Sequence, residues 1–192
     1  MIIYIVRHGE TEYNKTKRIQ GKQQVPLNIN GRTQASQAAE SLKQCKITHI
    51  YCSGLIRARE TAEIIDNYFS LPIVTDIRLN ERDWGAWENR YYHEIPNLIQ
   101  RTGTVWNEEN LDSSPHQGET TRDLMKRCAG FLNDLVKDHA VSDAILVITH
   151  GGPMRAILGI VNGLQDESYL RQDIGNGQIM IVKYDNSKFT IQ

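Results

Sequence analysis

Residues 2–11 read IIYIVRHGET, an apolar run that leads directly into an arginine and a histidine. Five apolar or β-branched residues in succession, at positions 2–6, predict a strand that is buried on both faces of a sheet. In open α/β sheets, ligands bind in the crevice beyond the carboxyl ends of the strands. We therefore expect Arg7 and His8 at a binding edge, where Arg7 supplies a permanent cation suited to phosphate or carboxylate.

Strand-like and helix-like patterns alternate along the rest of the chain. Apolar runs predict further strands at 47–52, 73–74, 144–149 and 179–184. Apolar stripes with helical spacing predict helices that begin after Asn30, at Ser53, at Thr120 or Thr121, and at residue 151, the last ending at Gly163. This alternation predicts an α/β fold, a three-layer α/β/α sandwich with a mostly parallel central sheet, in a single domain over residues 1–192.

One stretch, residues 87–118, has no clean period and is expected to form a small lid insertion. Trp87 and Trp106 lie within it, and Trp84 lies just before it. Two roles are open for these tryptophans, packing of the insertion onto the core or stacking against a substrate. We favour packing, because aromatic side chains bury large apolar surfaces.

Two other predicted strands also end in polar side chains. Ser53 follows the strand at 47–52, and His150 follows the strand at 144–149. The carboxyl ends of parallel strands share one edge of the sheet, so we expect His8, Ser53 and His150 to converge there.

The composition excludes several classes of partner. The net charge is −1, with 22 Lys and Arg against 23 Asp and Glu, so the chain has no field that would recruit nucleic acid or an acidic membrane. The cysteines Cys45, Cys52 and Cys128 are odd in number and lack C-x-x-C spacing, which favours a reducing compartment. No targeting segment or membrane-spanning run is recognised, and we expect a cytoplasmic protein.

Two readings of the histidine edge are a metal site and an anion site. Imidazole is a common metal ligand, but there is no H-E-x-x-H motif and the predicted neighbours Arg7 and Arg57 would repel a divalent ion. Gly151 and Gly152 open a predicted helix, whose free N–H groups and positive dipole end attract phosphate. We expect an anion site without a metal or cofactor.

Cations around a histidine favour phosphoryl transfer to nitrogen. Neighbouring positive charge lowers the pKa of an imidazole and keeps its lone pair available as a nucleophile. The leaving oxygen then needs a proton, which calls for a carboxylic acid. Spacing alone leaves Glu81, Asp83 and Glu88 open for that role.

Several motifs together resemble the histidine phosphatase superfamily, in its phosphoglycerate-mutase-like branch. The first motif is the RHGET sequence at 7–11, continued by Asn14 and by RIQG at 18–21. The later motifs follow in order along nearly the whole chain: SGLIRA at 53–58, LNER at 79–82, GE at 118–119 and HGG at 150–152.

The resemblance implies a role for each matching residue. His8 would be the phosphorylated nucleophile, and Glu81 the proton donor and then acceptor. Arg7, Arg57 and His150 would bind and stabilise the phosphoryl group. The remaining phosphate or substrate contacts implied are Asn14, Gln20, Gly21 and the Gly151 amide. Arg59 lies about 200° around the helix from Arg57, so only one of the two can face the site, and the motif selects Arg57.

The expected activity is metal-independent hydrolysis of a small phosphorylated metabolite through phospho-His8. The alternative within the family is a cofactor-dependent phosphoglycerate mutase, and a catalytically silent binding module on the same fold is a third. The predicted lid favours hydrolysis, because residues 91–117 contain one Arg, Arg101, and no Lys, against four acidic residues. Its acidic residues are Glu94, Glu108, Glu109 and Asp112.

Overall fold

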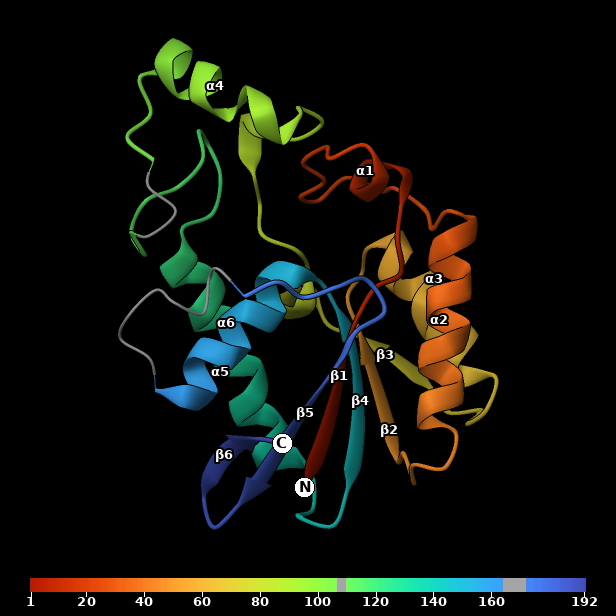
Figure 1. Ribbon diagram of the computed structural model, residues 1–192. Helices are drawn as coiled ribbons and strands as arrows, with labels where there is room; N and C mark the ends of the chain where they lie inside the picture. Colours follow the sequence, from red (N-terminus) through yellow and green to blue (C-terminus); the bar gives the residue numbers. More distant parts are fainter. Residues whose placement is uncertain (107–109, 164–171) are drawn as a thin grey trace.

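The computed structural model describes residues 1–106, 110–163 and 172–192 (Figure 1). The strands are β1 (Ile2–Arg7), β2 (His49–Cys52), β3 (Ile73–Thr75), β4 (Ala144–Thr149), β5 (Ile179–Asp185) and β6 (Lys188–Ile191). The α-helices are α1 (Glu12–Lys15), α2 (Ile29–Leu42), α3 (Ile56–Asp66), α4 (Ile95–Thr102), α5 (Thr121–Asp138) and α6 (Gly151–Asn162). Within these described ranges, no helix is long and apolar enough to span a lipid bilayer.

A single sheet has the strand order β3-β2-β4-β1-β5-β6. The pairs β1·β4, β2·β4 and β2·β3 are parallel, whereas β5 runs antiparallel to β1 and forms a hairpin with β6. The central strands β1 and β4 carry the fully buried apolar runs that the sequence predicts, with Ile3, Ile5 and Val147 completely inaccessible to solvent. Such continuous burial is typical of strands covered on both faces.

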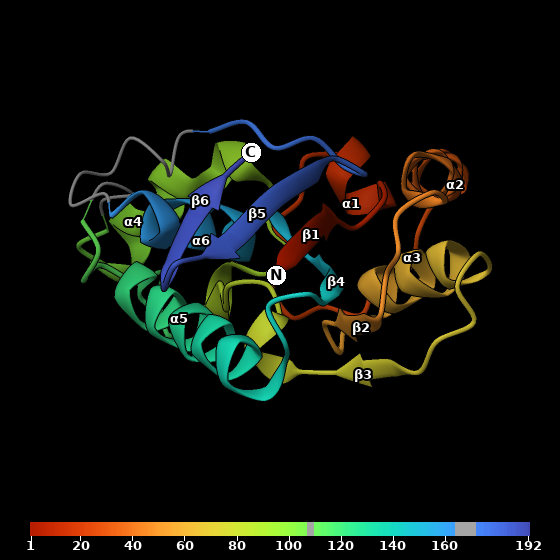
Figure 2. The same ribbon diagram turned by 90° about the horizontal axis from the view of Figure 1, so that it is seen from below.

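Helices cover both faces of the sheet, α2 and α3 on one side and α5 and α6 on the other (Figures 1 and 2). Each pair packs its apolar stripe onto the sheet in a separate core. The first core joins the helix alanines to Leu42, Ile50 and Ile148, and the second joins Phe131 and Leu132 to Ile145. The predicted three-layer α/β/α sandwich with a mostly parallel central sheet is confirmed.

Several element boundaries differ from the sequence prediction. Helix α2 begins after Asn28 rather than Asn30, because the Asn28 side chain accepts the Gly31 N–H at 2.8 Å. The N-cap of α3 is Leu55 rather than the predicted Ser53, so the helix begins at Ile56, and Leu55 forms no side-chain cap hydrogen bond. The predicted cap Thr120 and the predicted stop at Gly163 are both confirmed.

Strand β6 escaped prediction because it is short and only partly buried. The turn that precedes it places Asn186 and Ser187 at positive φ, 48° and 60°, which produces a tight hairpin. The polar segment between β1 and α2 contains the single-turn helix α1.

The described part of the predicted lid carries α4 and lies beyond the carboxyl ends of the parallel strands (Figure 1). Trp84 and Trp87 form a small core there with Ile19 and Leu98, and Trp106 packs against it with its ring centroid 5.3 Å from that of Trp87. The tryptophans do pack the insertion, but into a small core of its own with Ile19 rather than onto the two cores of the sheet.

The acidic side chains of this insertion are engaged locally where the structure describes them. The Glu94 carboxylate accepts a backbone N–H three residues earlier in the chain, and Asp112 forms an ion pair with Arg122. Glu108 and Glu109 lie outside the described residues.

Candidate active site

The histidines that follow β1 and β4 lie side by side. The parallel register pairs Arg7 with Thr149, so His8 and His150 each stand one residue beyond the last pair. The His8 N–H donates to the Thr149 carbonyl at 2.9 Å, and the two imidazole centroids are 5.0 Å apart. Ser53, at the end of neighbouring β2, accepts a hydrogen bond from His150 Nε2 at 2.7 Å. The predicted convergence of these strand ends is confirmed.

The hydrogen bonds of His8 define its tautomer. Its Nδ1 lies 2.6 Å from the Gly9 carbonyl oxygen, which can only accept, so Nδ1 carries the proton. Its Nε2 faces the Nε–H of Arg57 at 3.3 Å and accepts from it. The lone pair of His8 is therefore on Nε2, directed toward a guanidinium.

The surroundings of His8 keep the ring neutral. The side chain is buried, and this burial holds the pKa of His8 well below its usual value, with the positive charges of Arg57 and Arg7 lowering it further. The sequence predicts the effect of the two cations, but burial is the larger cause. A neutral imidazole with an unprotonated Nε2 is a nucleophile at neutral pH.

Arg57 is completely buried and is held rigidly. Its Nη1 donates to the Gln23 carbonyl and its Nη2 to the Gly21 carbonyl, both at 2.8 Å. Burial lowers the pKa of Arg57 to about 10, opposed by attraction to Glu81, so the guanidinium stays charged at neutral pH. Arg59, on the same helix, is exposed.

Arg7 is the second cation of the cluster and is partly buried. Its Nη1 donates to the Ile174 carbonyl, while its buried Nε has no hydrogen-bond partner. Burial lowers the pKa of Arg7, and the nearby Glu81 carboxylate opposes this effect. Among the described residues no carboxylate forms an ion pair with Arg7 or Arg57, so the two charges are available to an anion.

His150 is a neutral, buried histidine with one unused nitrogen. Burial holds its pKa well below the usual value, and the charge of Arg57 adds to the effect. Ser53 donates its hydroxyl proton to Asn80 Oδ1 at 2.8 Å, so it accepts from His150 Nε2. The His150 Nδ1 atom is buried without a partner, which is unusual for a polar atom and leaves it open to a ligand.

The start of α6 places two glycines and a carboxylate together. Gly151 is the first helical residue, so its N–H has no acceptor within the helix. The Gly152 N–H donates to Glu81 Oε1 at 3.1 Å, and the Arg82 N–H donates to the same oxygen at 2.8 Å. Glu81 is thereby held at the N-terminus of the helix that His150 caps.

The neighbouring carboxylates are engaged elsewhere. Asp83 forms an ion pair with Lys22 at 2.6 Å. Glu88 accepts the Lys22 N–H and the Gln23 side-chain amide, each at 2.8 Å, and so fixes the loop whose carbonyls hold the buried arginine of α3. Of the three candidates left open by spacing, Glu81 is the one at the α6 N-terminus.

The loop after β1 brings the remaining predicted contacts into the cluster. Asn14 Oδ1 accepts from the Thr11 N–H at 3.1 Å, which leaves the Asn14 Nδ2 group as a donor. Gln20 is nearly buried and accepts the Thr11 hydroxyl at 2.8 Å. Gly21 enters through its carbonyl, which binds Arg57.

Asn176 is a site residue that the sequence analysis missed. Its Nδ2 donates to the His8 carbonyl at 3.0 Å and approaches Asn14 Oδ1 at 3.4 Å. It lies just before β5, and because β5 is antiparallel to β1, its first residues stand where β1 ends. The available signal was the glycine-rich turn at residues 175–177.

Arg155 of α6 lies close to Arg7. It forms no ion pair with any residue in the described ranges. A Cβ built at Gly151 would lie 3.4 Å from Arg155 Nη1 and 3.6 Å from the guanidinium carbon of Arg7. The two guanidinium groups therefore lie near the same point. The second guanidinium adds positive charge beside the first.

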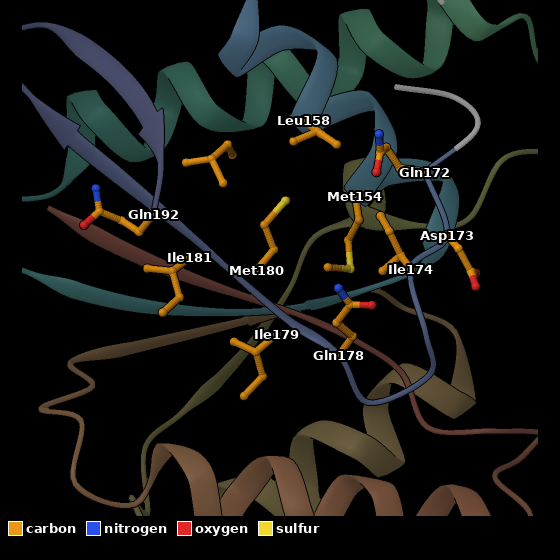
Figure 3. Close-up of a pocket in the computed structure, with 11 residues that line it drawn as sticks. Met154, Leu158, Gln172, Asp173, Ile174, Gln178, Ile179, Met180, Ile181 and Gln192 are labelled. Atoms are coloured by element: carbon orange, nitrogen blue, oxygen red, sulfur yellow. The ribbon is translucent and has the colours of Figure 1, made fainter. Parts of the chain in front are cut away.

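A separate pocket of about 310 Å³ lies on the other side of Ile174. Figure 3 shows its apolar wall, which includes Met154 and Leu158 of α6 and Met180 of β5. None of the strand-end histidines and buried arginines lines it, so the reactive groups belong to the cluster at the sheet edge. The one group of three metal-ligand side chains found among the described residues lies at the opposite edge of the sheet.

The cluster has the components for transfer of a phosphoryl group. Arg7, Arg57 and the Gly151 N–H can neutralise the oxygens of a phosphate. The lone pair of His8 can attack the phosphorus, and the Glu81 carboxylate at the start of α6 is the candidate to exchange a proton with the leaving oxygen.

Comparison with known proteins gives the same picture over the whole chain. The model of the histidine phosphatase superfamily (branch 1) matches residues 3–192. A Proteus mirabilis protein named "Probable phosphoglycerate mutase GpmB" is 38% identical over 189 residues, covering 96% of this chain and 86% of that protein. An Arabidopsis thaliana protein named "Phosphoglycerate mutase-like protein 4" is 34% identical, covering 99% of this chain and 83% of that protein.

Solved structures are similar over the same span. A mycobacterial glucosyl-3-phosphoglycerate phosphatase in complex with VO3 has a TM-score of 0.88 at 25% identity, covering 100% of this chain and 96% of that one. Bacillus stearothermophilus YhfR has a TM-score of 0.90 at 27% identity, covering 99% of this chain and 94% of that one.

Proposed function

Since the chain belongs to the histidine phosphatase superfamily, branch 1, we propose that it is a metal-independent phosphatase that hydrolyses a small phosphorylated metabolite through phospho-His8. The family expected from the sequence motifs is confirmed. Membership supports an enzyme that acts on phosphate esters, and the finer assignment rests on the geometry of the site.

The observation that carries this proposal is the state of His8. It is buried and neutral, and its Nε2 lone pair lies 3.3 Å from the Nε of a fully charged Arg57. A phosphate drawn to that guanidinium and to Arg7 would place its phosphorus beside the lone pair, with no counter-ion to displace.

The proposed reaction has two steps, phosphorylation of His8 and hydrolysis of phospho-His8. In the first, His8 Nε2 forms a bond to phosphorus while the bond to the leaving oxygen breaks, and the Glu81 carboxyl group donates its proton to that oxygen. In the second, Glu81 takes a proton from water as the water oxygen attacks phospho-His8. Inorganic phosphate leaves, and both side chains return to their starting states.

Hydrolysis is favoured over mutase activity by the scarcity of cations in the insertion above the site. Residues 91–117 contain one Arg, Arg101, and no Lys, so a substrate with several negative charges finds little compensation there. The relatives named as mutases make transfer back to a phosphoglycerate the second activity to test.

The test is phosphate release from a panel of phosphomonoesters that includes 3-phosphoglycerate, with a chelator present. The wild-type protein should release phosphate, His8→Ala should not, and the matched variant His49→Ala at the far edge of the sheet should behave as wild type. Activity that survives in His8→Ala or vanishes with the chelator would contradict the proposal. Isomerisation of 3-phosphoglycerate after priming with the bisphosphate, without hydrolysis, would establish the mutase instead.

A further inference from the structure

His49, His139 and Asp143 gather at the amino ends of the parallel strands, opposite the catalytic cluster. His49 is the first residue of β2, His139 caps the end of α5, and Asp143 directly precedes β4. One ligand atom from each residue lies within 4.8 Å of the other two. The two imidazole centroids are 4.3 Å apart, so the rings share one small space.

The hydrogen bonds of His49 leave one nitrogen free to bind a ligand. Its Nδ1 lies 2.9 Å from the Thr48 hydroxyl oxygen. That hydroxyl donates its own proton to the Ala144 carbonyl at 3.1 Å, so it accepts from His49 Nδ1. The lone pair of His49 is therefore on Nε2, and the side chain is exposed enough to turn.

His139 has the complementary arrangement. Its Nε2 is hydrogen-bonded to the Tyr51 hydroxyl at 2.8 Å, and its Nδ1 faces Asp143 Oδ2 at 3.6 Å. An imidazole that ligates a metal through one nitrogen usually bonds a second partner through the other, which fixes its orientation. Tyr51 is such a partner. In the tautomer that carries its proton on Nε2, His139 donates a hydrogen bond to the Tyr51 hydroxyl and has its lone pair on Nδ1.

The third ligand is also held in place. The Ala140 N–H donates to Asp143 Oδ2 at 3.0 Å, which fixes the carboxylate within the turn that follows α5. Helix α5 points its negative dipole end at this turn, because it ends at Asp138 and is capped by His139. A cation is therefore favoured here by the helix as well as by the carboxylate.

We propose that His49, His139 and Asp143 bind a divalent transition-metal ion of the zinc class, with water completing the coordination. Two imidazole nitrogens and one carboxylate oxygen are a donor set typical of Zn²⁺. Bond lengths of about 2.0–2.1 Å place tetrahedral ligands about 3.4 Å apart, close to the 3.6 Å between His139 Nδ1 and Asp143 Oδ2. The ligand atom of His49 lies within 4.8 Å of those of His139 and Asp143, and rotation of the exposed His49 side chain would bring it to bonding distance of the ion.

This site is separate from the catalytic cluster. Asp143 directly precedes β4 and His150 directly follows it, so a rise of about 3.3 Å per residue sets the two sites roughly 20 Å apart. The ion would join the turn after α5 to β2 and stabilise the folded chain. It would take no part in phosphoryl transfer, so its removal should lower the melting temperature while kcat stays unchanged.

The test is calorimetric titration of the full chain with Zn²⁺ in buffer free of phosphate and chelator, together with thermal unfolding. Wild type should bind one equivalent and melt at a higher temperature with the ion. His49→Gln should bind at least tenfold more weakly, and Tyr51→Phe about tenfold more weakly, because it loses only the orienting hydroxyl. The matched variant His93→Gln, which changes an exposed histidine elsewhere, should bind as wild type.

A His8→Gln variant separates this site from the catalytic histidines. It should keep the same stoichiometry and affinity for Zn²⁺. Loss of binding in His8→Gln, or wild-type affinity in His49→Gln, would overturn the proposal, as would the absence of any binding at millimolar Zn²⁺.

Discussion

The backbone N–H of Gly152 donates to Glu81 Oε1 at 3.1 Å, and no side chain larger than hydrogen fits between them. A Cβ at position 152 would lie 2.2 Å from that oxygen, far inside van der Waals contact. The absence of a side chain at Gly152 is therefore what lets the carboxylate approach the helix N-terminus. Gly152 thus positions Glu81, the general acid of the proposed reaction, although Gly152 itself takes no part in the proton transfer.

Gly152→Ala should thus impair catalysis without unfolding the protein. Alanine favours helix formation over glycine by up to about 1 kcal/mol, so the fold should tolerate the change, but Glu81 must move away. We expect kcat to fall by about 10²-fold, as for a misplaced general acid. The control is Gly130→Ala in α5, where the nearest atom would be 3.9 Å away; equal losses in the two variants would contradict this mechanism.

Glu81→Gln should separate substrates by their leaving groups. The amide cannot protonate a leaving alkoxide, so hydrolysis of alkyl phosphates should slow by about 10²–10⁴-fold. An activated aryl phosphate, whose leaving group needs no proton, should lose much less in the formation of phospho-His8. Steady-state rates and burst kinetics on both classes provide the measurement, and an equal loss on both would remove Glu81 from the acid role.

Arg57 and Arg59 form a matched pair on one helix, the first buried against His8 and the second exposed. Arg57→Lys should lower kcat/KM by about 10³-fold, because lysine cannot contact both loop carbonyls and the histidine while keeping its charge in place. Arg59→Lys should have wild-type kinetics. Vanadate inhibition and thermal melts of both variants would reveal whether any loss comes from the site or from the fold.

Much of the active site could be predicted from local patterns in the sequence. The buried runs before His8 and His150 mark two strands, and the parallel edge brings their ends together, so both histidines could be placed from sequence. Asn176 could not be placed in this way. An apolar run does not reveal the direction of its strand, and the turn before β5 reaches His8 only because β5 is antiparallel to β1. The approach of Gly152 to Glu81 likewise depends on packing between a loop and a helix distant in sequence.

The stability of the protein should fall below pH 6.5 because of its two buried histidines. Burial holds the pKa values of His8 and His150 well below 6.5, whereas each returns to about 6.5 in the unfolded chain. Below pH 6.5 the unfolded chain thus binds protons that the folded chain does not. The free energy of unfolding should then drop by up to about 1.4 kcal/mol per pH unit for each histidine, until the pH reaches the folded pKa.

Urea unfolding at pH 7.5, 6.0 and 5.0 measures this slope. His150→Gln should be less stable than wild type at pH 7.5 but should lose less free energy on acidification, since one of the two neutral histidines is gone. A slope identical to that of wild type would assign the acid sensitivity to other groups.

His150 should also take up a proton when an anion binds. The Ser53 hydroxyl donates a hydrogen bond to Asn80, so it accepts one from His150 Nε2. The buried Nδ1 of His150 therefore carries a lone pair and has no hydrogen-bond partner. A phosphate or vanadate beside Arg7 and His8 would repel that lone pair and raise the pKa of His150, so protonation of Nδ1 supplies the missing donor. Affinity should accordingly weaken as the pH rises above neutrality.

Calorimetry of vanadate binding at pH 7 in buffers of different ionisation enthalpy counts the protons taken up. The ion can itself gain a proton on binding, so the wild-type count alone does not identify the acceptor. His150→Gln makes the distinction, because it keeps a polar side chain in the same place but cannot be protonated. Uptake should decrease by up to one proton in this variant, since a neutral His150 is then no longer available to titrate; an unchanged count would mean that the anion carries the proton into the site.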